Sequence, residues 1–482
     1  YGNNEYVVNW YNDGEEIKEN TRKVYPYLGD DLGWKISNEA YYFKPGITWS
    51  GVGAKKMACR QYGEGFIFDS GANGLFVREP YKLEYFTALL NTDLIDRYIK
   101  LLNPTINTGA GTINSLPVQY DESLQDIIVD KTRCCIKISK SDWDAHETSW
   151  DYAENELIRI YKENHSEGIF MDANRLEDIV TLYKEYWTTQ FNQLHANEEE
   201  LNRQFIEIYG LQDELTPDVP LDEITILQQG EISIDSSASP QNDNAIVWHN
   251  DVLAKQLLSY AIGCMMGRYR LDRPGLHIAY PNPSPEDIEA YDFQGEKFEI
   301  DDDGIIPLLG RDCPFDDNAY NRVVKFIRQV FGDSFLNENL NFIEDALGKT
   351  IENYFVKDFW KEHKKMYSNR PIYWLFSSKK GAFQCLTYMH RMNPYTAEAV
   401  RSKYLLPYIE FLKNKIAADM ERAASLSTIE RRQLDKMQSA LDECLEYEER
   451  LHDVADQQIH FDLDDGVVAN YAKFGDVLAK IK

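Results

Sequence analysis

Residues 44–60 read KPGITWSGVGAKKMACR, a stretch with three glycines, one tryptophan, four cations and no acidic residue. The run from Ile47 to Ser50 has the β-branched and aromatic residues that favour a strand, and glycines bound it on both sides. Similar short runs recur nearby, separated by Gly- and Asn-rich turns: EYVVNWYNDG, NEAYYFKPGITWSG and GEGFIFDSGANGLFV. The pattern predicts strands and hairpins in the first part of the chain.

A helical pattern follows at residues 83–102, LEYFTALLNTDLIDRYIKLL. It ends before Asn103–Pro104, because proline cannot continue a helix. The short strands and this helix together predict a mixed α/β domain over residues 1–120.

The remaining residues favour helices. Residues 121–240 repeat apolar side chains every three to four positions and predict a helical spacer domain that ends in a connector rich in Pro, Ser and Asn. Residues 241–315 begin with an apolar helix and continue as an acidic, loop-rich segment. Residues 316–482 predict a C-terminal helical domain with an antiparallel helix pair, joined at a capping box of Ser427 and Glu430. The expected fold class is α+β.

Charge is unevenly distributed along the 482 residues. The chain has 51 Lys and Arg against 80 Asp and Glu, a net charge of −29. Residues 1–120 hold 12 cations and 14 acids, a net of −2, so residues 121–482 carry −27. Because nucleic-acid affinity rests largely on cations that neutralise phosphates, the first segment is the better candidate for contact with an anion.

Several classes of protein are disfavoured. No apolar run reaches the ~20 residues that span a bilayer, and no signal-peptide pattern opens the chain. The seven cysteines form no C-x-x-C pair and the nine histidines no zinc-binding spacing, so we expect a cytoplasmic protein without a metal site. A P-loop is absent, which disfavours nucleotide hydrolysis.

Two motifs imitate binding loops without meeting their requirements. Trp49–Gly53 resembles the glycine-rich turn that holds S-adenosylmethionine, but Pro45 precedes it and no helical pattern follows. Residues 299–304 begin like an EF-hand loop, but the position that must supply a bidentate Glu is Gly310. We expect no cofactor in this chain and interpret the acidic motif as a solvated turn.

The candidate DNA-binding residues come from the stretch 44–60 and from two Gly-rich loops that follow it. Glycines let a backbone approach a phosphate, cations neutralise it, and hydroxyl and amide side chains can hydrogen-bond bases or sugars. The candidates are Lys44, Thr48, Trp49, Ser50, Lys55, Lys56, Arg60, Asn73, Asn107 and Thr108. The alternative for the stretch 44–60 is a solvent-exposed basic hairpin that binds nothing, and the alternative for Asn73, Asn107 and Thr108 is ordinary turn chemistry.

Several long phrases in the chain are similar to those of a known family. They are YGNNEYVVNW, YYFKPGITWS, GFIFDSGANGLFV, NPTINTGAGTINSLPV, SDWDAHETSWDY, ELNRQFIEIYGLQDELTPDV, LLSYAIGCMMGRY, RPIYWLFSSKKGAFQ and FDLDDGVVANYAKF. From residue 1 to about 475 the series resembles the C-terminal half of PglX, the adenine-specific DNA methyltransferases of bacterial BREX phage-defence systems.

The resemblance implies a role in marking host DNA and in phage restriction. Family members transfer a methyl group from S-adenosylmethionine in an N-terminal domain with an [Asn/Asp]-Pro-Pro-[Tyr/Phe] motif, whereas this chain has no Pro-Pro pair. We therefore expect no catalytic residue here and no activity from this chain alone. The exit Ile113–Val118 resembles the end of a target-recognition domain, which places DNA recognition within residues 1–120.

The partners implied are double-stranded DNA and the absent N-terminal methyltransferase domain. An alternative function is an acidic helical interaction module, which would dock other BREX proteins or a phage inhibitor that mimics DNA. No membrane partner is expected.

Overall fold

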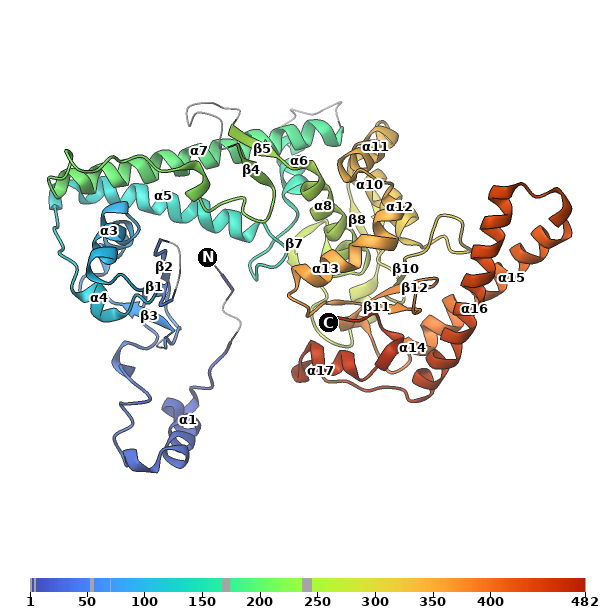
Figure 1. The fold of residues 1–482 in the computed structure, drawn as a ribbon, viewed down its shortest axis with the longest axis horizontal. Helices are drawn as coiled ribbons and strands as arrows, with labels where there is room; N and C mark the ends of the chain where they lie inside the picture. The colour runs from blue at the N-terminus through green and yellow to red at the C-terminus, as the bar shows by residue number, and fades with distance from the viewer. Residues whose placement is uncertain are drawn as a thin grey trace. The chain divides into compact units, whose positions relative to one another are not determined.

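The structure is a computed structural model that describes residues 2–3, 6–52, 56–69, 71–166, 174–235 and 245–481. Two compact units result from the contacts within the chain. Unit 1 comprises residues 1–143, 186–228 and 234–247, and unit 2 comprises residues 144–185, 229–233 and 248–482. The two units are coarser than the four segments expected from the sequence, whose limits stay predictions. The fold is α+β and mostly helical, as predicted (Figure 1).

Unit 1 is built around a three-stranded antiparallel sheet with the order β2-β1-β3. Its elements are α1 (Tyr11–Val24), β1 (Gly46–Ser50), β2 (Cys59–Tyr62), β3 (Ala72–Leu75), α2 (Leu83–Leu90), α3 (Asp93–Leu102), α4 (Ala110–Asn114), α5 (Gln125–Asp144) and most of α7 (Leu176–Ile208). One face of β1 is buried against α2, α3 and α7, through side chains such as Tyr85, Leu89, Ile95 and Phe205. The first 120 residues thus share their core with the helices that follow them.

Two expectations for this region were wrong in detail. The stretch EYVVNWYNDG forms no strand among its described residues, and its end begins α1. The single helix expected over residues 83–102 is two helices, because the Asn91 side chain bonds the backbone of Cys59 in β2 and Thr92 caps α3 by accepting from the Ile95 amide. The predicted end at Asn103 is confirmed.

Unit 2 packs helices around a second antiparallel sheet with the order β10-β12-β11. Its first part contains α6 (Glu156–Ser166), α8 (Asn250–Met265) and the hairpins β6 (Tyr269–Arg270) with β7 (Arg273–Leu276) and β8 (Tyr291–Phe293) with β9 (Glu296–Phe298). Separately from these hairpins, a two-stranded ladder pairs β4 (Ile232–Ile234) with β5 (Ile246–Trp248), and both strands lie at the limits of the two units.

The C-terminal part of unit 2 contributes the sheet and most of the helices. Its elements are β10 (Ile305–Pro307), α10 (Ala319–Phe331), α11 (Leu336–Leu347), α12 (Ile351–Tyr354), the π-helical turn η7 (Phe355–Phe359), α13 (Trp360–Met366), β11 (Tyr373–Ser377), β12 (Gln384–Tyr388), α14 (Thr396–Ala399), the π-helical turn η9 (Val400–Leu405), α15 (Leu406–Glu421), α16 (Thr428–Asp456) and α17 (Val467–Ala472). The expected helix pair is α15 with α16, and the capping box of Ser427 and Glu430 is present.

The central sheet of unit 2 adds two strands, β11 and β12, that were not expected within the C-terminal helical domain. Every residue of β11 is buried, so its sequence shows no alternation of polar and apolar side chains. Residues near the C-terminus pair with β11: Leu478 forms an antiparallel bridge with Phe376, and the Ala479 amide donates to the Leu375 carbonyl. In the part of the chain that the structure describes, no helix is both long and apolar enough to cross a membrane.

Candidate nucleic-acid interface

The described residues predicted to contact DNA lie on or beside the β2-β1-β3 sheet of unit 1 (Figure 1). Alternate residues of β1 point to opposite faces: Ile47 and Trp49 are buried in the core, while Thr48 and Ser50 lie on the other face. Arg60 of β2 stands directly opposite Thr48, so its side chain shares the outer face. The hydroxyl groups of β1 and the exposed Arg60 of β2 therefore lie on the same face of the sheet.

Trp49 belongs to the core and not to this surface. Only 1% of its surface is exposed, and its indole N–H donates to the Thr108 carbonyl oxygen at 2.8 Å. The expectation that its ring reaches a base does not fit this burial. Trp49 instead attaches the loop after α3 to the sheet.

The loop 103–109 is fixed on the end of β1. The Thr108 amide donates to the Gly51 carbonyl at 2.7 Å, and Val52 bridges Asn107. Within the loop, the Asn103 side chain donates to the Asn107 carbonyl at 2.6 Å and accepts from Thr105, so this amide is engaged in the turn. The backbone of Thr108 is thus structural, and the loop presents Asn107 in a defined position.

Two side-chain amides lie close to Gly51. A β-carbon at Gly51 would stand 3.5 Å from Nδ2 of Asn73 and 3.8 Å from Oδ1 of Asn107. Neither amide has a hydrogen-bond partner among the described residues, although both lie in a region where Asn usually stabilises turns. Two free amides beside a glycine are suited to hydrogen-bonding the edge of a base.

The cations of the stretch 44–60 differ in availability. Lys56 contacts Asp93 at the start of α3 and lies 3.8 Å from the Glu223 carboxylate, which leaves 29% of its side chain exposed. Lys44 is exposed, with its ammonium 5.4 Å from the centre of the Tyr41 ring, and Arg60 forms no ion pair with a described residue. Lys55 lies outside the described residues.

The surroundings of Lys56 are acidic. Burial raises the pKa of Glu198 on α7 to about 7, the Lys56 charge opposes this rise, and Asp93 and Glu223 add to it. Lys56 therefore balances carboxylates of unit 1, and its charge is committed within the protein.

An aromatic cluster that the sequence did not single out lies next to the outer face of the sheet. Tyr62 of β2 packs edge-on against Phe66 and Phe76, and Phe76 contacts Phe68 and Tyr41. Gly46 and Gly74 leave room for the Tyr62 hydroxyl, since a β-carbon at either position would lie within 3.1 Å of it. The signal available in the sequence was the dense aromatic spacing of YYF and GFIFD.

The acidic motif of residues 299–304 is not a solvated turn, because Asp301 is completely buried. One of its oxygens accepts from the amides of Gly304 and Ile305, and Arg322 contacts the other. Asp303 pairs with Lys403 at 2.8 Å. Asp301, Asp302 and Asp303 are close enough to hold a metal ion, but protein cations already balance two of these carboxylates.

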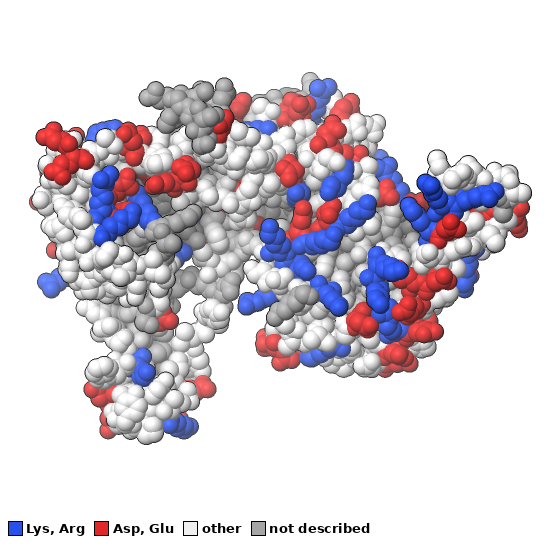
Figure 2. All heavy atoms as spheres, viewed as in Figure 1, with Lys and Arg blue, Asp and Glu red and all other residues white. Residues whose placement is uncertain are grey.

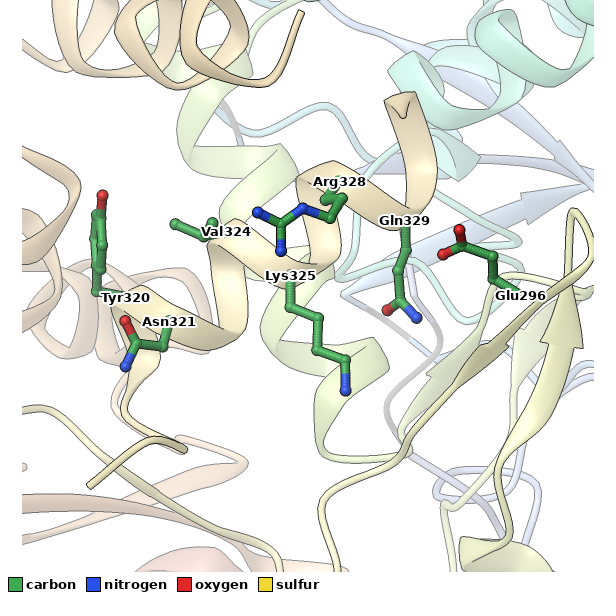
Figure 3. A pocket seen from close by; sticks show the side chains of 7 residues that line it. All are labelled: Glu296, Tyr320, Asn321, Val324, Lys325, Arg328 and Gln329. Atoms are coloured by element: carbon green, nitrogen blue, oxygen red, sulfur yellow. The ribbon is translucent and has the colours of Figure 1, made fainter. Parts of the chain in front are cut away.

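A surface hollow of about 440 Å³ lies on unit 2 along α10 (Figure 3). Three of its polar side chains have partners: Lys325 pairs with Glu299, Arg328 with Asp333, and Gln329 donates to a backbone carbonyl. The hollow is open and offers no set of converging free groups, so we assign it no chemistry.

Comparison with known proteins identifies relatives of this chain but no matching family model. The chain is 33% identical, over its whole length, to the adenine-specific methyltransferase BrxX of Escherichia coli O9:H4 (strain HS), of which it covers 39%. It is also 33% identical to the adenine-specific methyltransferase PglX of Lacticaseibacillus casei (strain Zhang), where the match covers 98% of the chain and 37% of the relative. The chain thus spans about two fifths of the length of these relatives and matches one part of them.

Proposed function

We propose that this chain reads the sequence of double-stranded DNA for an adenine-specific DNA methyltransferase. Its similarity to two adenine-specific methyltransferases supports a related role. Because the sequence has no Pro-Pro pair, we further propose that S-adenosylmethionine is bound, and the methyl group transferred, by a part of the enzyme outside these residues.

The observation that carries the proposal is the pair of side-chain amides at Gly51, which have no hydrogen-bond partner among the described residues. Asn and Gln side chains recognise adenine by donating to N7 and accepting from the N6 amino group, and each such pair contributes about 1–3 kcal/mol of discrimination. Asn73 and Asn107 approach the same point from β3 and from the loop 103–109. Thr48, Ser50 and Arg60 on the outer face would contact the adjoining backbone.

Gly51→Ala tests this assignment without disturbing the fold. The new methyl group would meet its neighbours at 3.5 Å or more, which is ordinary van der Waals contact, and it would occupy the space between the two amides. We expect a motif enriched by the wild-type chain from a random duplex pool to lose about 10-fold in affinity, with unrelated duplexes unaffected. Asn73→Ala with Asn107→Ala should have the same effect.

Two controls match these variants. Gly63→Ala adds a methyl group at an exposed glycine with nothing within 4 Å. Asn337→Ala with Asn341→Ala removes two exposed amides from α11 in unit 2. Enrichment of no motif by the wild-type chain, or equal loss in the control variants, would contradict the proposal.

A further inference from the structure

A second basic segment lies in unit 2, in the part of the chain whose total charge argues against nucleic-acid contact. Residues 357–380 hold seven Lys and Arg against Asp358 and Glu362, a net of +5. Since the whole chain carries −29, the other residues carry −34. Figure 2 shows Lys and Arg gathered over the part of unit 2 where Figure 1 places α13.

Three lysines of this segment form a row on one face of the helical run 351–366. Lys357, Lys361 and Lys365 are spaced four residues apart, and all three side chains are exposed. Lys361 and Lys365 lie about 6 Å apart along α13, and Lys357 precedes them in the π-helical turn η7. We call these three residues the lysine row. Lys364 and Lys480 adjoin it, since the Lys364 ammonium donates to the Lys480 carbonyl at 3.3 Å.

The lysine row differs from the many lysines of unit 2 that form ion pairs, such as Lys255, Lys325 and Lys403. None of its three ammonium groups forms an ion pair with a described residue. The two carboxylates of the segment have other partners: Asp358 pairs with Lys349 at 2.8 Å, and Glu362 lies 3.2 Å from Lys255. Asp358 also interacts electrostatically with Lys357 and Lys361, but the three lysines form no ion pair with a described residue and outnumber it, so the row is a surface with positive charge available to a partner.

Buried side chains fix the helix that carries the lysine row to the core of unit 2. His363 is 98% buried and its Nε2 accepts from the amides of Ile372 and Tyr373, while the Trp360 indole donates to the Tyr373 carbonyl. Burial lowers the pKa of His363 to about 3, so the ring is a neutral acceptor at physiological pH. Fixed lysine positions reduce the conformational entropy that is lost on binding.

We propose that the lysine row binds the phosphate backbone of nucleic acid without reading its sequence. The row lies along an exposed helix face and does not converge on a pocket, which suits a repeating array of charges and not a single small anion. Protein–protein interfaces are depleted in Lys and enriched in Arg and aromatic residues, so the composition favours a polyphosphate over an acidic protein. The inference extends the proposed function, because it adds a sequence-independent contact to the reading site of unit 1.

The test compares two triple variants of the whole 482-residue chain. Lys357→Gln, Lys361→Gln and Lys365→Gln remove the lysine row. Lys297→Gln, Lys325→Gln and Lys413→Gln remove three lysines that pair with Asp292, Glu299 and Glu410, for the same change in net charge. Fluorescence anisotropy with two duplexes of unrelated sequence, titrated at 50–200 mM salt, gives the affinity and its salt dependence, and circular dichroism checks the fold.

We expect the row variant to bind both duplexes at least 10-fold more weakly at the lowest salt. Its slope of log affinity against log salt should be smaller by about 2.7, or about 0.9 for each phosphate that a lysine no longer neutralises. The control variant should keep the wild-type slope. Equal loss in both variants, an unchanged slope in the row variant, or displacement of the duplex by poly-glutamate at equal charge would overturn the proposal.

The result is separable from the test of the reading site. Gly51→Ala changes the discrimination between duplexes and leaves the salt slope unchanged, whereas the row variant weakens all duplexes alike. If only the discrimination between duplexes fails to change in Gly51→Ala, the reading site is contradicted. If only the affinity and salt slope fail to change in the row variant, the lysine row is contradicted.

Discussion

The two basic segments of this protein, residues 44–60 and 357–380, differ in what their cations contact. In the first, Lys56 is engaged by Asp93 and Glu223, and the tryptophan at the centre is buried. In the second, Lys357, Lys361 and Lys365 have no carboxylate partner among the described residues. A count of charges along the sequence predicts only the sum, because ion pairs between distant residues decide which cations remain available.

The two regions also differ in the kind of interaction that their exposed groups can make. Around Gly51 the free groups are mainly amides and hydroxyls, which carry directional hydrogen bonds and hence specificity. On the helical run 351–366 they are point charges, which carry affinity that salt weakens.

The largest effect is expected from Trp49→Ala. Removing a completely buried indole should lower the free energy of unfolding of unit 1 by about 3–5 kcal/mol. Urea unfolding followed by circular dichroism measures this change. Trp34→Ala, at a side chain that is 84% exposed, is the matched control and should change stability by about 0.5 kcal/mol or less. If Trp49→Ala lost DNA affinity and kept its stability, Trp49 would be a DNA contact and not a core residue.

A smaller effect is expected from Glu443→Ala, which acts on the turn between β11 and β12 that carries Lys379 and Lys380. One Glu443 oxygen accepts from the Ser378 hydroxyl and the Lys380 amide at 2.6 Å each. Leaving these donors unpaired should cost about 1–3 kcal/mol and speed hydrogen exchange over residues 378–383. Glu449→Ala, at an exposed position of α16, is the control. Equal exchange in both variants would show that Glu443 does not fix the turn.

The acidic surroundings of Lys56 predict a pH dependence of about 1–3 kcal/mol. Burial raises the pKa of Glu198 to about 7, so the folded protein holds this proton more tightly than the unfolded chain. The contribution is therefore fully present below the unfolded pKa of about 4.3 and is lost as the pH rises through 7. Urea unfolding at pH 5 and pH 8 should show a smaller difference for Glu198→Gln than for the wild type. If Glu198→Gln showed the same stability difference between pH 5 and pH 8 as the wild type, Glu198 would not be the group responsible.

The smallest effects are expected from single lysine substitutions, one in each basic segment. Lys361→Gln should weaken duplex binding about 2- to 5-fold at low salt and reduce the salt slope by about 0.9, because its exposed ammonium forms no ion pair with a described residue. Lys56→Gln should change affinity less than 2-fold, because its charge is already balanced by Asp93. Anisotropy titrations measure both, and the reverse order would show that the first segment supplies the backbone contact.

Sequence periodicity predicted the amphipathic elements well and the fully buried ones poorly. The helices α7, α8, α15 and α16 were expected from their apolar spacing, and the capping box at Ser427 was found where predicted. The strand β11 was missed because all five of its residues are buried, which removes the period of two. The break at Asn91 was missed because its cause is a bond to Cys59, 32 residues earlier.

The sequence by itself determined the fold class, the end of α3 before Pro104, the segment that holds the proposed reading site and the similarity to adenine-specific methyltransferases. Tertiary structure alone decided the fate of individual side chains. It buried Trp49, paired Lys56, brought Asn73 and Asn107 to the two sides of Gly51, and left the lysine row exposed. The physical reason is that local propensity depends on neighbours in the chain, whereas burial and ion pairing depend on neighbours in space.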